Sequence, residues 1–234
     1  IKALEAQGIV PDIVVGTSAG SVVGAMYAAG KSGFELQTLA ITLDESQVSD
    51  WSLPDRCVLK GDALAAFINK AIGNVQIEKL PKRFGAVATD LASGEPIVFR
   101  SGDTGTAVRA SSSVPGIFQP VSIRGREYVD GGLVSPVPVR FAREMGATFV
   151  IAVDISNKPQ MGKTKSSLDV LLQTFAIMGQ SLNRSELPQA DIVIRPDISQ
   201  LASADFRTRH LAVLEGEKAA AQAMPALKEK LENW

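Results

Sequence analysis

The spacing of apolar and polar residues along the chain switches repeatedly between the period of a strand and that of a helix. Short β-branched apolar runs, typical of buried strands, alternate with longer segments in which apolar residues recur at helical spacing. The short runs predict strands at 12–15, 84–89, 96–99, 121–123, 127–129, 148–153 and 191–194. The helical spacing predicts helices at 1–7, 19–30, 34–43, 62–73, 104–110, 138–145, 168–185 and 210–231. This alternation predicts a layered α/β fold with a central, mostly parallel sheet.

Length and composition favour a single domain that spans residues 1–234. Apolar residues make up 45% of the chain and charged residues 21%, which suits an ordinary globular protein. A net charge of −1, without a basic run, gives no reason to expect a nucleic-acid partner. No apolar stretch reaches the ~18–20 residues needed to cross a bilayer. A polar stretch at 157–167 is expected to form a mobile surface loop.

The stretch from Ile13 to Tyr27 predicts a strand, a sharp turn and a helix, with a serine at the turn. Gly16-Thr17-Ser18-Ala19-Gly20 matches the G-x-S-x-G pattern in which a strained turn presents a serine hydroxyl at a helix N-terminus. We expect added bulk at Gly16 or Gly20 to collide with this turn. The glycines fit neither a G-x-x-x-x-G-K-[ST] nor a G-x-G-x-x-G phosphate loop. The pattern therefore predicts that Ser18 is a nucleophile.

A serine nucleophile needs a neighbouring base, and the chain offers two kinds. His210 is the single histidine, and the order serine, aspartate, His210 matches an α/β-hydrolase triad. However, His210 lies among arginines in a helical pattern, whereas a triad histidine usually lies on a loop. Asp130 ends a predicted strand before Gly131 and Gly132, and partial burial beside the serine would raise its pKa toward that of a useful base. The other aspartates at strand boundaries are Asp90, Asp154 and, less favourably, Asp12.

The G-x-S-x-G turn and the downstream Asp130-Gly131-Gly132 together resemble the patatin-like phospholipase family. Further matching stretches lie at 84–90, 109–120 and 190–196, so the resemblance covers most of residues 1–220. The resemblance implies a three-layer α/β domain, Ser18 as nucleophile and Asp130 as its base, acting on acyl esters of lipids. It also implies a supporting role for the residues around this pair, namely Gly16, Thr17, Ala19, Gly20, Gly131 and Gly132.

One part of the family pattern is missing from the sequence. The family carries a glycine-rich loop before its first helix, whose backbone N–H groups form the oxyanion hole, and that loop would lie upstream of Ile1. We therefore expect an upstream segment that the printed sequence does not include. The expected location is the cytoplasm or the surface of a membrane. A signal peptide in the upstream segment would change this expectation.

Two other functional classes remain open alongside the serine–aspartate hydrolase. One is an α/β-hydrolase esterase that uses His210 in a triad, and the other is a non-catalytic interaction scaffold of the same fold. The preferred hypothesis predicts a lipid or acyl-ester substrate and a peripheral membrane contact, with Ile117, Phe118 and the 157–167 stretch at the rim of the lipid site. No histidine, cysteine and carboxylate set has metal-ligand spacing, so neither a metal nor another cofactor is expected.

Overall fold

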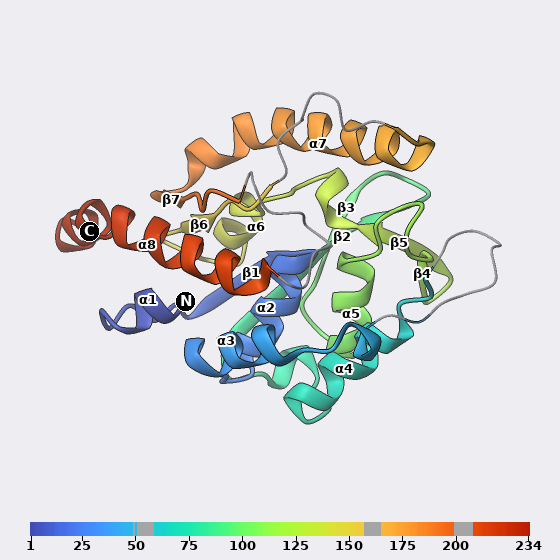
Figure 1. The fold of residues 1–234 in the computed structure, drawn as a ribbon, viewed down its shortest axis with the longest axis horizontal. Coiled ribbons are helices and arrows are strands. Elements are labelled where there is room, and N and C mark those ends of the chain that lie inside the picture. The colour runs from blue at the N-terminus through green and yellow to red at the C-terminus, as the bar shows by residue number, and fades with distance from the viewer. Residues whose placement is uncertain (49, 51–58, 157–164, 199–207) are drawn as a thin grey trace.

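The computed structural model describes residues 1–48, 50, 59–156, 165–198 and 208–234 (Figure 1). A five-stranded sheet contains β1 (Ile13–Thr17), β2 (Arg83–Asp90), β3 (Pro96–Phe99), β4 (Val121–Ile123) and β5 (Arg126–Asp130). A second, two-stranded parallel sheet pairs β6 (Ile151–Val153) with β7 (Ile192–Ile194).

The α-helices lie close to the positions that the sequence predicts. They are α1 (Lys2–Glu5), α2 (Ala19–Ala28), α3 (Gly33–Thr42), α4 (Asp62–Ile72), α5 (Thr104–Ser111), α6 (Val139–Glu144), α7 (Ser167–Glu186) and α8 (Arg209–Glu232). Short 3-10 turns lie at η1 (Glu45–Gln47), η2 (Ile77–Lys79), η3 (Gly131–Leu133) and η4 (Leu187–Gln189). Local sequence fixes several ends: α7 starts at a capping box formed by Ser166 and Asp169, and α4 stops at Gly73 in the left-handed conformation.

Helices cover both faces of the larger sheet. A Cβ at Gly24 of α2 would lie 3.1 Å from Val14 and 3.2 Å from Phe84, so α2 packs on the face to which these side chains point. A Cβ at Gly85 would meet Met145, which follows α6. Because neighbouring strand residues point to opposite faces, Gly85 lies on the face opposite to that of Phe84. The sheet therefore lies between α2 and α6, and the predicted three-layer α/β class is confirmed.

The central strand β2 brings the ends of β1 and β5 together. Ala86 and Val87 of β2 pair with β1 and with β3, so these two strands lie on opposite edges of β2. Ala88 and Thr89 pair with β3 and with β5, so β5 lies on the same edge as β1. Because β1 is parallel to β2 and β5 is antiparallel to it, the C-terminal ends of β1 and β5 point toward each other.

The sheet is mixed, which corrects the prediction of a mostly parallel one. Only β1 and β2 are parallel in the five-stranded sheet, whereas β3 and β5 are antiparallel to β2 and β4 is antiparallel to β5. The reason is local: short turns at 91–95 and 124–125 join β2 to β3 and β4 to β5, and a short turn can only join antiparallel strands.

Candidate active site

Ser18 occupies a strained position between β1 and α2. Its φ of 53° and ψ of −124° lie outside the regions that a residue with a side chain normally adopts. Hydrogen bonds fix this conformation: the Ser18 N–H donates to Ser111 Oγ at 2.9 Å, and the Ser21 hydroxyl donates to the Ser18 carbonyl at 2.7 Å. The predicted strand–turn–helix is therefore present, with the serine held at the N-terminus of α2.

The two glycines of the turn have different roles. A Cβ at Gly16 would lie 2.3 Å from the carbonyl oxygen of Gly20, a backbone contact that cannot give way. A Cβ at Gly20 would meet nothing within 4 Å. The prediction that bulk at both positions would collide is correct for Gly16 and wrong for Gly20, because Gly20 supplies the backbone that Gly16 approaches.

Asp130 is buried at the end of β5, and only part of its hydrogen-bonding capacity is used. Its side chain is turned back on the next residues, so that Oδ1 accepts a hydrogen bond from the Gly132 N–H at 2.7 Å. Oδ2 is buried and has no hydrogen-bond partner of good geometry among the described residues. Burial raises the pKa of Asp130 to about 6, although its interactions with the Ser18 side chain and the Gly132 N–H lower it.

The strand register explains why Ser18 and Asp130 are neighbours. Thr17 pairs with Val87 and Asp130 pairs with Ala88, on the same edge of β2. A Cβ at Gly131 would lie 2.2 Å from the Val87 carbonyl oxygen and 3.1 Å from Thr17 Cγ2. Gly131 is therefore needed because the chain after Asp130 passes directly against the backbone of β2 and the side chain before Ser18.

The segment after α5 contacts both members of the pair. Ser111 accepts the hydrogen bond from the Ser18 N–H, and the Ser113 carbonyl accepts one from the Asp130 N–H at 2.9 Å. No sequence motif assigns a role to these serines. Three consecutive serines that are all buried are unusual, but burial is not visible in the sequence.

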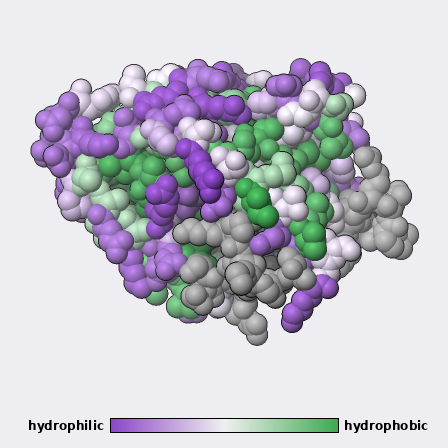
Figure 2. All heavy atoms as spheres, turned by 90° about the horizontal axis from the view of Figure 1, so that it is seen from above, coloured by the Kyte–Doolittle hydropathy of each residue, from purple (hydrophilic) through white to green (hydrophobic). Residues whose placement is uncertain are grey.

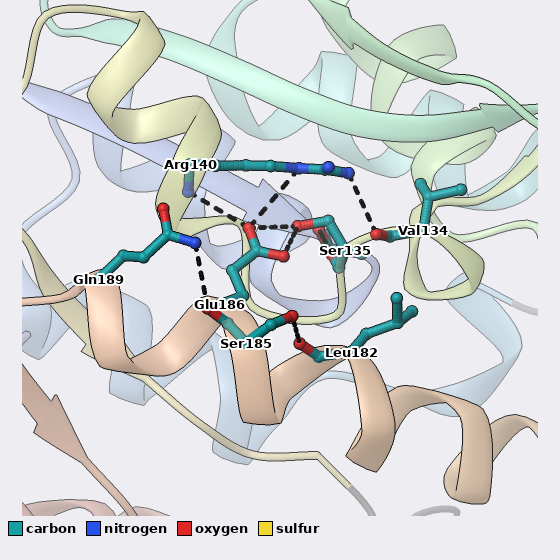
Figure 3. A network of polar contacts seen from close by, with 8 residues as sticks. Val134, Ser135, Arg140, Leu182, Ser185, Glu186 and Gln189 are labelled. Carbon is teal, nitrogen blue, oxygen red and sulfur yellow. Dashed lines mark hydrogen bonds and ion pairs between the residues drawn. The ribbon is translucent and has the colours of Figure 1, made fainter.

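A buried carboxylate supports the same region from α7 (Figure 3). Glu186 accepts hydrogen bonds from the Ser135 hydroxyl at 2.8 Å and from the Arg140 N–H at 3.2 Å. The Ser135 carbonyl in turn accepts a hydrogen bond from the Thr17 hydroxyl at 2.8 Å. This network links the end of α7 to the residue before Ser18, and no local sequence pattern reveals it because its members are far apart along the chain.

The other candidate bases are placed differently. Asp90 forms an ion pair with Arg126 at 2.5 Å, and the hydrogen bond from this guanidinium holds the pKa of Asp90 down at about 2. Asp154 forms an ion pair with Arg195 at 3.3 Å, and Asp12 is exposed where the chain enters β1. His210 is exposed near the start of α8, and no described hydrogen bond connects it to Ser18 or Asp130. Asp130 is thus the candidate base that the fold brings to the serine.

The described residues contain no group of three or more histidine, cysteine, aspartate and glutamate side chains that could hold a metal ion. None of the described helices is long and apolar enough to span a membrane. Of the residues expected at the rim of a lipid site, Ile117 and Phe118 are half-buried. Most of the 157–167 stretch, residues 157–164, lies outside the described residues.

Fold and site together define a three-layer α/β protein with a serine–aspartate pair where two strands of one sheet converge. Comparison with known proteins identifies its family: the model of the patatin-like phospholipase family matches residues 1–143. The chain belongs to this family.

Several curated proteins are similar to the chain. An uncharacterized NTE family protein of Mycobacterium tuberculosis is 28% identical over 95% of this chain and 43% of its own length. A second one from that organism is 33% identical over 67% of this chain and 44% of its own length. Patatin-like phospholipase domain-containing protein 6 of Mus musculus is 31% identical over 87% of this chain and 15% of its own length. The chain thus spans less than half the length of these curated relatives.

Proposed function

We propose that this chain is a lipid acyl hydrolase that cleaves carboxylic esters through Ser18 and Asp130. The observation that carries the proposal is the buried Asp130 carboxylate, which interacts with the Ser18 side chain, at the strand end that faces the strained Ser18 turn. Membership of the patatin-like phospholipase family supports an ester hydrolase that acts on lipids.

The first half of the proposed reaction forms an acyl-enzyme. Ser18 Oγ attacks the carbonyl carbon of the ester while Asp130 accepts the hydroxyl proton. The negative charge that develops on the carbonyl oxygen is favoured by the N-terminus of α2, which begins directly after Ser18. When the tetrahedral intermediate collapses, Asp130 returns the proton to the departing alcohol oxygen, and the acyl group remains on Ser18.

The second half releases the acid. Asp130 accepts a proton from a water molecule as this water attacks the acyl-enzyme carbonyl. The bond to Ser18 Oγ then breaks, the proton passes to this oxygen, and the free carboxylic acid leaves. One aspartate can serve both halves because its pKa of about 6 lies close to neutral pH, where it can accept and return a proton.

The decisive experiment compares variants by fluorophosphonate labelling and by turnover of a neutral, water-soluble ester. Ser18→Ala should abolish labelling, and both Ser18→Ala and Asp130→Asn should reduce turnover by about a thousandfold or more. His210→Ala is the matched control and should keep wild-type turnover. Loss of activity in the His210 variant would favour the triad esterase, whereas a wild-type protein that neither labels nor turns over the ester would favour the scaffold.

We also propose a peripheral contact between α7 and a lipid surface. No side chain from 168 to 178 is buried, although this part of α7 is mainly apolar, and no charged residue lies between Asp169 and Arg184. The exposed apolar side chains are Leu168, Val170, Leu172, Ile177 and Met178. Figure 2 views the molecule from the α7 side and shows apolar side chains among polar ones on this face. The same helix packs against η3, which follows Asp130, so a lipid that α7 contacts would lie near the proposed base.

A further inference from the structure

A cavity of about 390 Å³ with polar and apolar lining residues lies at the ends of β6 and β7. Asp154 follows β6, and Arg195 follows β7; both residues line the cavity. The two strands are parallel, so their carboxyl ends meet at one edge, which is where open α/β sheets commonly bind ligands. The volume is in the range of small-molecule sites.

The cavity lies beside the candidate active site but does not include it. Gly179 and Glu186 of α7 face the segment after Asp130, since a Cβ at Gly179 would lie 3.3 Å from Pro136 and Glu186 binds Ser135. The neighbouring residues Gln180 and Asn183 line the cavity instead. One helix therefore separates the cavity from the segment that carries Asp130.

The charged side chains around the cavity favour an anion. Arg184, in the last turn of α7, lines the cavity, and its guanidinium makes no hydrogen bond or ion pair with any described residue. Arg195 is paired with Asp154 at 3.3 Å and is still half-exposed. The described lining residues carry two guanidinium groups and one carboxylate, hence a net positive charge, and guanidinium groups recognise phosphate well.

A buried amide adds a second requirement on the ligand. Asn183 is 6% exposed and donates to Ser156 Oγ at 2.9 Å, while its Oδ1 atom is buried and has no hydrogen-bond partner among the described residues. Asn183 lines the cavity, and whichever way the amide is turned, one of its polar atoms is left unpaired. Unpaired buried polar groups are costly, so a ligand that supplies hydroxyl groups would complete the site. The Asp154 carboxylate is a further acceptor for such a hydroxyl.

We propose that this cavity, with Arg184, Arg195, Asn183 and Asp154, binds a phosphate ester that carries free hydroxyl groups, such as glycerol phosphate. The two guanidinium groups bind the phosphate oxygens, and Asn183 and Asp154 bind the hydroxyls. This ligand chemistry occurs both in the headgroup of a glycerophospholipid and in a free sugar or glycerol phosphate. That the ligand belongs to a lipid substrate depends on the proposed hydrolase function. The proposed binding site depends only on the residues of the cavity.

Isothermal titration calorimetry with sn-glycerol 3-phosphate, inorganic phosphate and glycerol tests the site. We expect saturable binding of glycerol phosphate, weaker binding of phosphate and none of glycerol. Arg184→Gln should weaken glycerol phosphate binding about tenfold or more, and Arg184→Lys should restore part of it. Arg100→Gln removes the same charge from an exposed residue that does not line the cavity and should leave binding unchanged. Absence of saturable binding, or equal binding by the Arg184→Gln and Arg100→Gln variants, would overturn the proposal.

Kinetics then separate the two sources of the ligand. If the site holds a lipid headgroup, Arg184→Gln raises the KM for phosphatidylglycerol and leaves the turnover of the neutral ester unchanged. If calorimetric binding is lost while both substrates keep their KM, the ligand is a free phosphate ester. A wild-type protein without activity on either ester would contradict the proposed hydrolase, and calorimetry would still decide whether the cavity binds glycerol phosphate.

Discussion

At the scale of single residues, Asp130 shows how burial can create a base. An exposed aspartate titrates near 4 and is a weak base at neutral pH. The end of β5 removes this carboxylate from water, and its interactions with the Ser18 side chain and the Gly132 N–H compensate only in part. The result is a pKa of about 6.

This pKa predicts the pH dependence of the proposed reaction. The ionised form of Asp130 accepts the proton of Ser18, so kcat/KM for a neutral ester should rise with pH and reach half of its plateau near pH 6. The rate is measured from pH 4 to 9. His210→Ala should show the same midpoint as the wild type, because His210 is exposed and has no described contact with the pair. A midpoint that vanishes in this variant would assign the titration to the histidine.

The same burial predicts a gain in stability when the charge is removed. A raised pKa means that the native state binds the proton more tightly than the unfolded state does. The contribution of Asp130 to stability is therefore fully present below its unfolded pKa, near 4. This contribution is lost as the pH rises through about 6. Asp130→Asn should raise the free energy of unfolding above pH 6 by up to about 3 kcal/mol, with a difference that disappears below pH 4. Urea denaturation at pH 4 and pH 8 measures this, and equal differences at both values would contradict it.

At the scale of elements, the turn between β1 and α2 depends on close backbone packing. Gly16→Ala should destabilise the protein by about 3 kcal/mol or more, because its Cβ would meet the Gly20 carbonyl oxygen at 2.3 Å. Gly20→Ala should be neutral or stabilising by up to about 1 kcal/mol, because its Cβ meets nothing and alanine favours a helix. Thermal unfolding of the two variants provides the comparison. A tolerated Gly16→Ala would show that the turn can relax.

Helix α7 allows a matched test of the lipid contact. Ile177→Asp should weaken binding to phospholipid vesicles about tenfold, because burial of an isoleucine side chain contributes about 1.5–3 kcal/mol. Ile41→Asp is the control: Ile41 is also exposed, but it lies on α3, on the other side of the molecule from α7 (Figure 1). Vesicle co-sedimentation measures both. Equal losses in the two variants would argue against a contact specific to α7.

The sequence predicts elements better than it predicts how they meet. The turn at Ser18 and the strand end at Asp130 are visible because glycines mark them locally. Their convergence on one edge of β2 depends on strand register, which the sequence does not predict, and on strand direction, which was predicted as mostly parallel and is mixed. Ser111, Ser113 and Glu186 reach the site only through packing between distant segments, so no local pattern could reveal them.

At the scale of the whole molecule, the α/β class and its three layers follow from the alternation of strand and helix patterns. The mixed direction of the sheet follows only in part: the short turns at 91–95 and 124–125 require antiparallel pairs, whereas the antiparallel pairing of β5 with β2 joins segments far apart in the chain. That one domain spans residues 1–234 remains a prediction. The proposed site draws on segments from β1 to α7, so its geometry is a property of the assembled fold.

This long-range assembly has a consequence for the protein while it is being made. The bond from Ser18 to Ser111 spans 93 residues, that from Thr17 to Ser135 spans 118, and Glu186 joins Ser135 from 51 residues further on. A nascent chain on the ribosome therefore exposes the serine long before its aspartate and the supporting carboxylate have emerged. If Ser18 is the nucleophile, translation itself delays hydrolysis until the chain through Glu186 has left the exit tunnel.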